Sequence, residues 1–133
     1  MQVVPYLFFD GRCDEAFEFY RKAVGAKVEM LMRYKDSPDP NMVHGNAEKV
    51  MHASLQVGDG TVLASDGRCQ GQPSFHGFAL SLTASDDAEA KRFFDALAEG
   101  GQVQVPLAKT FFASSFGMVA DRFGVGWMVY VPS

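Results

Sequence analysis

The spacing of apolar residues changes several times along the chain, and each change marks a predicted element. Residues 3–9 form a β-branched and aromatic run that ends at the turn pair Asp10-Gly11, as expected of a buried strand. Apolar side chains then recur every three or four positions over residues 14–24, and Gly25 follows them, which predicts an amphipathic helix ending at this glycine. Residues 27–34 return to a strand-like pattern.

The next segment has little apolar content and predicts a long loop followed by a hairpin. Residues 36–46 contain two prolines and a glycine, and we interpret them as a loop that serves as a lid or a dimer arm. Strands are predicted at 50–57 and 61–65, because the intervening Gly58-Asp59-Gly60 is typical of a tight hairpin turn. Residues 66–74 are rich in glycine and polar side chains, which favours a linker.

The second half of the chain repeats this order of elements. A strand is predicted at 75–83, then a helix with Ser85 as N-cap and a stop at Gly100-Gly101, then strands at 102–107, 116–120 and 126–131. Placing Ala16 and Phe19 over Ala90 and Phe93 aligns the two predicted helices and the strands before them. The sequence therefore predicts a single α+β domain over residues 1–133, made of two βαβββ modules at 1–66 and 75–133.

This arrangement has a consequence for the faces of the predicted sheets. One helix covers only one face of each sheet, so the other face of each needs cover of its own. Two equivalent curved mixed sheets provide that cover by forming a common cavity. We therefore expect a fold that encloses a small ligand.

Composition and charge exclude several classes of partner. The chain has 133 residues and 47% hydrophobic content, enough for a core. Its net charge is -4 and its Lys and Arg residues are scattered, which argues against nucleic acid and against an anionic membrane surface as partners. The apolar residues 1–9 lack a basic flank and are too short for a signal peptide or a membrane span. Cys13 and Cys69 have no ligand-like spacing, which fits a reducing compartment, and we expect the cytoplasm.

Several stretches of the chain resemble one known family. The opening strand–turn–helix at residues 4–26 looks like the start of a vicinal-oxygen-chelate module. The stretch Thr110-Phe111-Phe112 and the run FGMVADRFGVGWM at 116–128 resemble the closing signature of PhnB-like proteins. With residues 51–55 and the strand end Ala64-Ser65-Asp66, the resemblance covers nearly the whole chain. It places the chain with the PhnB-like branch of the glyoxalase/bleomycin-resistance superfamily.

The resemblance implies a paired βαβββ fold, a homodimer and a ligand cavity, but it leaves the chemistry open. The superfamily includes metal-dependent isomerases, dioxygenases and lyases beside metal-free drug-sequestering proteins. Proteins of this type are also labelled demethylubiquinone methyltransferases. We reject that label, because the sequence has no strand, Gly-rich loop and helix of the kind that binds nucleotide-like cofactors.

The metal site that the resemblance implies is incomplete in this chain. Its four ligand positions match Pro5, His52, Gly77 and Met128, of which only His52 is a metal ligand of the expected kind. A single imidazole holds a divalent ion weakly, so we predict no metal cofactor, with His52 as the one candidate ligand. His76 is one position from a ligand site, but strand alternation would point it to the opposite face unless a β-bulge intervenes. We expect a structural role for His76 and solvent exposure for His44.

Six residues are candidates for lining a ligand cavity, although the sequence assigns no catalytic residue; they are His52, Ser65, Phe112, Ser114, Trp127 and Met128. His52 is alternatively a structural residue, and Trp127 and Met128 are alternatively core or dimer contacts. Relatives often carry Trp and His at the positions of Phe112 and Ser114. Asp121 is expected to form a turn by bonding its own backbone, with Gly124 at positive φ.

Three hypotheses for function follow. The first is a homodimeric, metal-independent protein that binds a small apolar or aromatic molecule. The second is a metal-dependent lyase, isomerase or dioxygenase in which His52 is a metal ligand or general base. The third is a dimeric interaction module without a cavity.

Overall fold

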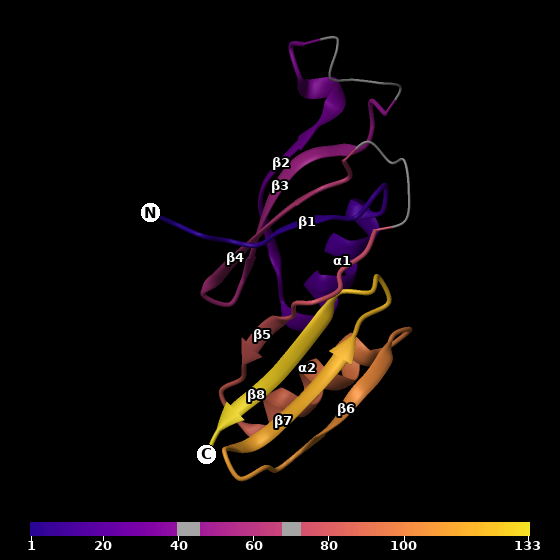
Figure 1. The fold of residues 1–133 in the computed structure, drawn as a ribbon. Helices are drawn as coiled ribbons and strands as arrows, with labels where there is room; N and C mark the ends of the chain where they lie inside the picture. Colours follow the sequence, from indigo (N-terminus) through magenta and orange to yellow (C-terminus); the bar gives the residue numbers. More distant parts are fainter. Residues whose placement is uncertain (40–45, 68–72) are drawn as a thin grey trace. The chain divides into compact units, whose positions relative to one another are not determined.

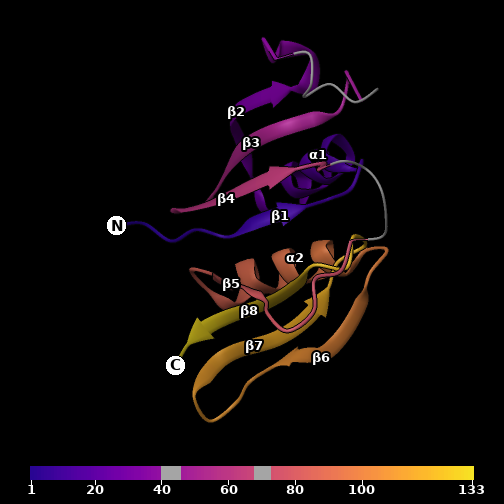
Figure 2. The ribbon, with the colours of Figure 1, turned by 45° about the horizontal axis from the view of Figure 1, so that its top comes forward.

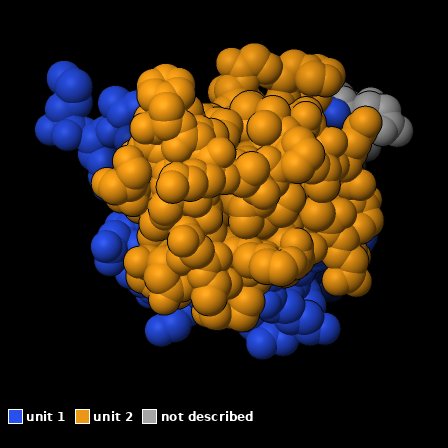
Figure 3. All heavy atoms as spheres, turned by 90° about the horizontal axis from the view of Figure 1, so that it is seen from below, with its two compact units in different colours: residues 1–73 blue, residues 74–133 orange. Residues whose placement is uncertain are grey.

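The computed structural model describes residues 1–39, 46–67 and 73–133 (Figure 1). The chain divides into two compact units, residues 1–73 and 74–133, coloured separately in Figure 3. The boundary falls within the predicted linker. His44, Cys69 and part of the predicted loop 36–46 lie outside the described residues. The single-domain organisation and the common cavity stay predictions.

The first unit is a four-stranded mixed sheet with one helix. Its strands are arranged in the order β1-β4-β3-β2, in which only β1 and β4 are parallel. The elements are β1 (Tyr6–Phe8), α1 (Cys13–Val24), β2 (Lys27–Arg33), the short 3₁₀ helix η1 (Tyr34–Asp36), β3 (Val50–Val57) and β4 (Gly60–Ser65).

The second unit repeats this topology. Its sheet has the order β5-β8-β7-β6, again with one parallel pair, β5 and β8. The elements are β5 (Leu80–Thr83), α2 (Asp87–Ala98), β6 (Gln102–Ala108), β7 (Ala113–Ala120) and β8 (Gly126–Pro132). The predicted α+β fold of two βαβββ modules is confirmed.

The helix ends follow from local hydrogen bonding. Gly25 ends α1 at φ 71°, as predicted. The N-cap of α2 is Asp86 and not Ser85, because the Asp86 carboxylate accepts a hydrogen bond from the backbone N–H of Glu89 at 2.8 Å. The Glu89 carboxylate also accepts from the N–H of Ser85, the residue before the N-cap, at 3.0 Å, and the N-cap lies one residue later than predicted.

Some strand bounds also differ from the prediction. β1 and β5 are shorter than expected, because residues 3–5 and 75–79 lie outside the strands; of these, Val3 is 90% and Phe78 46% exposed. Tyr34 belongs to η1 and not to the preceding strand, since the Asp36 carboxylate accepts the Arg33 N–H and closes a turn. β7 begins at Ala113, three residues earlier than predicted.

Each helix covers one face of its own sheet (Figures 1 and 2). In the first unit the buried strand residues Leu7, Ala53, Leu55 and Ala64 share the face toward α1. In the second unit Phe94 of α2 packs on β7, and an added Cβ at Gly117 would lie 2.7 Å from the Phe94 ring. Glycine at this position therefore permits the close approach of helix and sheet. Neither helix in the described part of the chain is long and apolar enough to cross a membrane.

Candidate functional site

The face of the first sheet opposite α1 carries a connected set of apolar and polar side chains. Strand alternation and register place residues from all four strands on it. We call this set the first open face; its members are Tyr6, Phe8, Met30, Met32, His52, Ser54 and Leu63.

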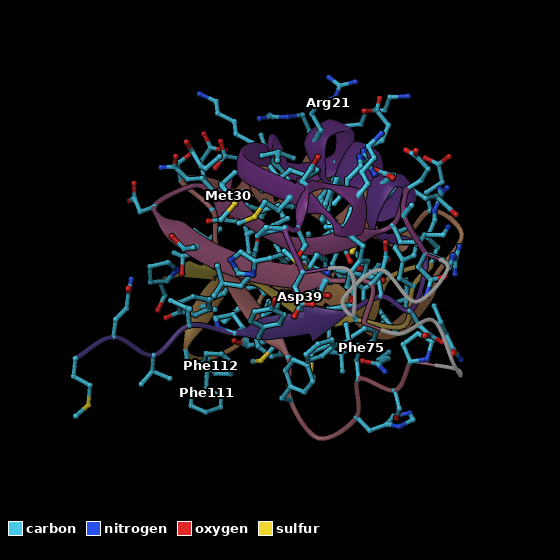
Figure 4. All side chains as sticks on the ribbon, turned by 90° about the horizontal axis from the view of Figure 1, so that it is seen from above. Arg21, Met30, Asp39, Phe75, Phe111 and Phe112 are labelled. Carbon is cyan, nitrogen blue, oxygen red and sulfur yellow. The ribbon has the colours of Figure 1, made fainter. Side chains whose placement is uncertain are left out.

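The apolar members of the first open face are unusually accessible for side chains of their kind. Tyr6 is 38% exposed and Phe8 55%, while Met30 and Met32 are each 39% exposed. Met30 lies on β2, where Figure 4 labels it. By contrast Leu7, between Tyr6 and Phe8, is 2% exposed and belongs to the core. The first open face thus presents an apolar surface that the unit's own helix does not use.

A hydrogen-bonded pair lies within this apolar surface. The Tyr6 hydroxyl and Nδ1 of His52 share a hydrogen bond of 2.7 Å, and their ring centroids are 5.5 Å apart. Tyr6 also stacks on Phe8 at 5.0 Å. Burial raises the pKa of the Tyr6 phenol, and Tyr34 and Cys13 add in the same direction, while the Ser65 side chain opposes them. The pair is the main polar feature of the first open face.

The hydroxyl of Ser65, which was predicted to line a cavity, is hydrogen-bonded to nearby backbone groups. Ser65 is 2% exposed, and its hydroxyl donates to the Val50 carbonyl at 3.4 Å and accepts from the Gly67 N–H at 2.9 Å. The next residue, Asp66, is also buried and accepts from three backbone N–H groups, those of Gly11, Cys13 and Val50. This end of β4 therefore organises the chain around the start of α1.

The second sheet has a corresponding aromatic surface opposite α2, which we call the second open face. The register pairs Phe116 with Tyr130 and Met118 with Met128. Phe112 lies 5.2 Å from the Phe116 ring and stacks on Tyr130 at 6.4 Å. Its members are Phe112, Phe116, Met118, Met128 and Tyr130. Phe111 lies beside Phe112 and is 98% exposed (Figure 4).

Ser114 is not part of the second open face, because it is bonded to the start of α2. The hydroxyls of Ser114 and Ser115 both donate to Oδ1 of Asp87, each at 2.7 Å. A register irregularity between Ala113 and Ser115 allows neighbouring side chains to reach one carboxylate. Both hydrogen bonds lower the pKa of Asp87. The Ser114 side chain is therefore bonded to the start of α2, whereas Phe112 packs with the rings of the second open face.

Trp127 also faces away from the second open face. Trp127 is 4% exposed. Because it precedes Met128 on β8, its side chain points to the opposite face of the sheet, toward α2. Its Nε1 donates to Oδ2 of Asp121 at 2.9 Å. Oδ1 of Asp121 accepts from the N–H groups of Phe123 and Val125, and Gly124 has φ 88°. The turn-forming role predicted for Asp121 is confirmed, and the contacts of Trp127 favour its alternative role in packing.

The four positions implied for a metal do not form a suitable donor set. Pro5 and Gly77 offer no side-chain ligand, Met128 offers only a thioether, and Nδ1 of His52 is bonded to Tyr6. His76 lies outside any strand, since β5 begins at Leu80, so the alternation argument does not apply to it. Its Nδ1 contacts the Ser74 hydroxyl at 2.8 Å. Within the described residues, no three His, Cys, Asp or Glu side chains are grouped as metal ligands.

Cys13 is a free cysteine within the described residues. It is fully buried at the start of α1. Burial raises the pKa of its thiol strongly, and the neighbouring Asp66 carboxylate adds to the effect. Cys13 therefore behaves as a core residue.

Sequence reasoning identified His52 but missed its neighbours Tyr6, Phe8, Met30 and Met32. The signal was present in the first apolar run, where Tyr6 and Phe8 alternate with Leu7 and Phe9. Such alternation indicates that one set faces the helix and the other faces away.

Comparisons with known proteins agree on one family. A family model described as 3-demethylubiquinone-9 3-methyltransferase matches residues 1–130. Protein YjdN from Escherichia coli K12 is 33% identical over 142 residues, covering 98% of this chain and 95% of that protein.

Solved structures agree with the fold. The crystal structure of protein PA1353 from Pseudomonas aeruginosa is 46% identical, with a TM-score of 0.87 over 99% of this chain and 98% of that one. A Bacillus cereus protein titled putative 3-demethylubiquinone-9 3-methyltransferase, PhnB protein, is 23% identical, with a TM-score of 0.82 over 98% and 99% of the two chains. A glyoxylase/bleomycin resistance protein/dioxygenase domain from Frankia has 15% identity and a TM-score of 0.64 over 99% and 95%, which shows a shared fold. The chain belongs to the PhnB-like family, whose model is described as 3-demethylubiquinone-9 3-methyltransferase, and has the glyoxalase/bleomycin-resistance fold.

Proposed function

We propose that this protein binds a small apolar or aromatic molecule on the first open face and that binding requires no divalent metal. The observation that carries the proposal is the exposed group Tyr6, Phe8, Met30 and Met32 around the Tyr6–His52 hydrogen bond. Ligand sites are commonly apolar with a few polar groups that fix orientation. The first open face has this composition.

The chemistry of these side chains suits an uncharged ligand. Aromatic rings contribute a large contact area, and methionine adapts its shape and contacts aromatic rings through sulfur. The seven named members include no Lys, Arg, Asp or Glu, and the register places Lys27, opposite Gln56, at the rim of the same face. At the centre of the face a charged ligand would lose its hydration without an opposite charge in return.

The second open face supports the same class of ligand. It combines aromatic rings with Met118 and Met128, and Phe112 is 41% exposed. We therefore include Phe112 and Met128 among the proposed ligand contacts, together with His52. We leave out Ser65, Ser114 and Trp127, because their polar atoms bond other parts of the protein.

We do not propose methyl transfer, although the family model's description names it. Nucleotide-like cofactors bind beyond the carboxyl ends of neighbouring parallel strands, next to a Gly-rich loop. Each sheet described here has a single parallel pair at one edge, and the turn from β1 to α1 has one glycine, Gly11. The donor chemistry at Pro5, His52, Gly77 and Met128 likewise gives no reason to propose a metal-dependent reaction.

The proposal includes a homodimer in the cytoplasm. The homodimer is carried over from the family resemblance, and the cytoplasm fits a chain with two cysteines, of which Cys13 is buried and free. Nucleic acid and membrane surfaces are not proposed as partners, given the net charge of -4. Sedimentation velocity at several concentrations tests the dimer directly, and a monomer throughout would contradict it.

Binding can be tested with the uncharged fluorophore N-phenylnaphthylamine and two charge substitutions on the same strand. Met30 lies on the first open face, whereas Val28 is paired with Leu55 and faces the side of α1. Both are similarly accessible, at 39% and 47%. Met30→Glu should weaken binding by about tenfold or more, since a carboxylate would have to be desolvated beside the ligand. Val28→Glu should leave affinity unchanged; equal effects, or no binding by the wild type, would contradict the proposal.

A further inference from the structure

We propose that the Tyr6–His52 pair recognises a hydrogen-bond-accepting oxygen, so that the ligand is a planar aromatic molecule carrying a carbonyl or similar acceptor. This inference rests on the proposed function and specifies the ligand class of the first open face. It follows from the direction of one hydrogen bond and from the rings around it.

The direction of the hydrogen bond follows from the chemistry of its two partners. In neutral imidazole one ring nitrogen carries hydrogen and the other accepts. The phenol of Tyr6 keeps its proton near neutral pH, because burial raises its pKa further above the ordinary value of 10.0. A phenol O–H is a stronger donor than a neutral imidazole N–H, and a bare imidazole nitrogen is a stronger acceptor than a phenol oxygen, so we assign Tyr6 as the donor to Nδ1 of His52 across 2.7 Å. This contact places the imidazole hydrogen on Nε2.

The Nε2–H group is then the donor that the pair offers to a ligand. Among the described residues, Tyr6 is the one that hydrogen-bonds the His52 ring, and it does so at Nδ1. The first open face therefore presents a donor at Nε2, which favours an acceptor atom on the ligand.

The shape of the surroundings indicates a planar ligand. Tyr6 and Phe8 stack at 5.0 Å with 28° between their planes, and the His52 ring lies 5.5 Å from Tyr6. Tyr6 and Phe8 remain 38% and 55% exposed in this cluster, so a further aromatic ring can pack against them. Met32 is directly opposite His52 in the strand register, so its thioether flanks the same cluster.

A matched pair of probes tests the inference: acetylnaphthalene, which carries a carbonyl, and ethylnaphthalene, which has nearly the same shape without it. Their affinities are measured by displacement of N-phenylnaphthylamine. The wild type should prefer the ketone by about fivefold, as expected for one net hydrogen bond. His52→Phe keeps a ring but loses the donor, so it should abolish the preference, which is read as the ratio of the two affinities within each variant.

Two further variants separate hydrogen bonding from packing. His52→Gln provides an amide N–H in place of the imidazole donor and should keep most of the ketone preference. Tyr6→Phe removes the contact that places hydrogen on Nε2 and should reduce the preference by about twofold. An unchanged urea denaturation midpoint shows that each variant retains the fold, and the ratio of the two probe affinities is compared within each variant.

The outcomes separate this inference from the proposed function. Binding of both probes with equal affinity, unaffected by His52→Phe, would overturn the acceptor recognition and leave the apolar site intact. Equal loss of preference in His52→Phe and His52→Gln would assign the effect to packing and also overturn it. Failure of the wild type to bind either probe would overturn the proposed function itself.

Discussion

The indole nitrogen of Trp127 donates a hydrogen bond to Oδ2 of Asp121 over 2.9 Å, and both side chains are buried. Asp121 follows β7 and Trp127 lies on β8, so the bond joins the turn between these strands to the strand that follows. The second carboxylate oxygen accepts the N–H groups of Phe123 and Val125. One side chain thus satisfies three donors at a buried turn.

Asp121→Ala should therefore destabilise the protein strongly. It leaves three donors without their acceptor in a buried turn, which we expect to cost about 3 kcal/mol in the free energy of unfolding. Trp127→Phe removes one of these donors but keeps an aromatic ring, and should cost less, about 1 to 2 kcal/mol. Urea denaturation measures both. A loss below about 1 kcal/mol for Asp121→Ala would contradict this role of the carboxylate.

In the first unit, Asp66 likewise accepts hydrogen bonds from three backbone N–H groups. Its carboxylate accepts the N–H groups of Gly11 and Cys13 at 2.9 Å and that of Val50 at 2.8 Å. Asp66→Ala should cost about 3 kcal/mol in urea denaturation, because the start of α1 and the start of β3 both lose their acceptor. Asp59→Ala, in the exposed hairpin turn, is the matched control and should stay within about 0.5 kcal/mol of the wild type. Similar losses in the two variants would show that the Asp66 network is unimportant.

Gly117→Ala tests the close packing of α2 on its sheet. The added Cβ would lie 2.7 Å from Cε2 of Phe94 and 3.0 Å from Cα of Leu107, so helix or strand must shift. We expect a loss of about 2 kcal/mol in the free energy of unfolding, typical of overpacking. Gly60→Ala is the control, since its nearest neighbour is the Val57 carbonyl at 3.5 Å. If Gly117→Ala is no less stable than Gly60→Ala, the close approach is not required.

Hydrogen bonds from Ser114 and Ser115 lower the pKa of Asp87, so this pKa can be used to test them. Ser114 and Ser115 lower it below the ordinary value of 3.8, so the folded state holds the charged carboxylate more favourably than the unfolded state does. The resulting stabilisation is present above that ordinary pKa and is lost as pH falls through the lower, folded-state value. Ser115→Ala should raise the pKa of Asp87 toward 3.8, as measured by NMR titration of the carboxyl resonance. Ser81→Ala, on β5, is a control that should leave the pKa of Asp87 unchanged, and an equal shift in both variants would contradict the assignment.

The periodic parts of the fold could be predicted from sequence because their patterns depend on neighbours along the chain. Helix α1 ends at Gly25 as expected, and β3 has the predicted bounds, Val50–Val57. Strand ends were less predictable, since they depend on the partner strand. Phe9 and Phe75 continue apolar runs and are buried, but neither belongs to a strand.

The candidate site was only partly predictable for a similar reason. His52 was identified from its chemistry, but its hydrogen-bond partner Tyr6 is 46 positions away along the chain and became apparent only from the sheet register. Ser114 was assigned to a cavity because the family resemblance places residues 111–116 at a cavity mouth. The irregularity beside it lets both serine hydroxyls reach Asp87 instead.

Methyl NMR of methionine-labelled protein is the most direct measurement of the central claim, that the first open face binds an apolar ligand. Of the seven methionines, Met30 and Met32 lie on that face, and single substitutions to leucine assign their signals. Saturating acetylnaphthalene should shift the Met30 and Met32 methyl resonances through the ring current of the bound ligand. Ligand-induced shifts that leave both resonances unchanged would place binding elsewhere and contradict the claim.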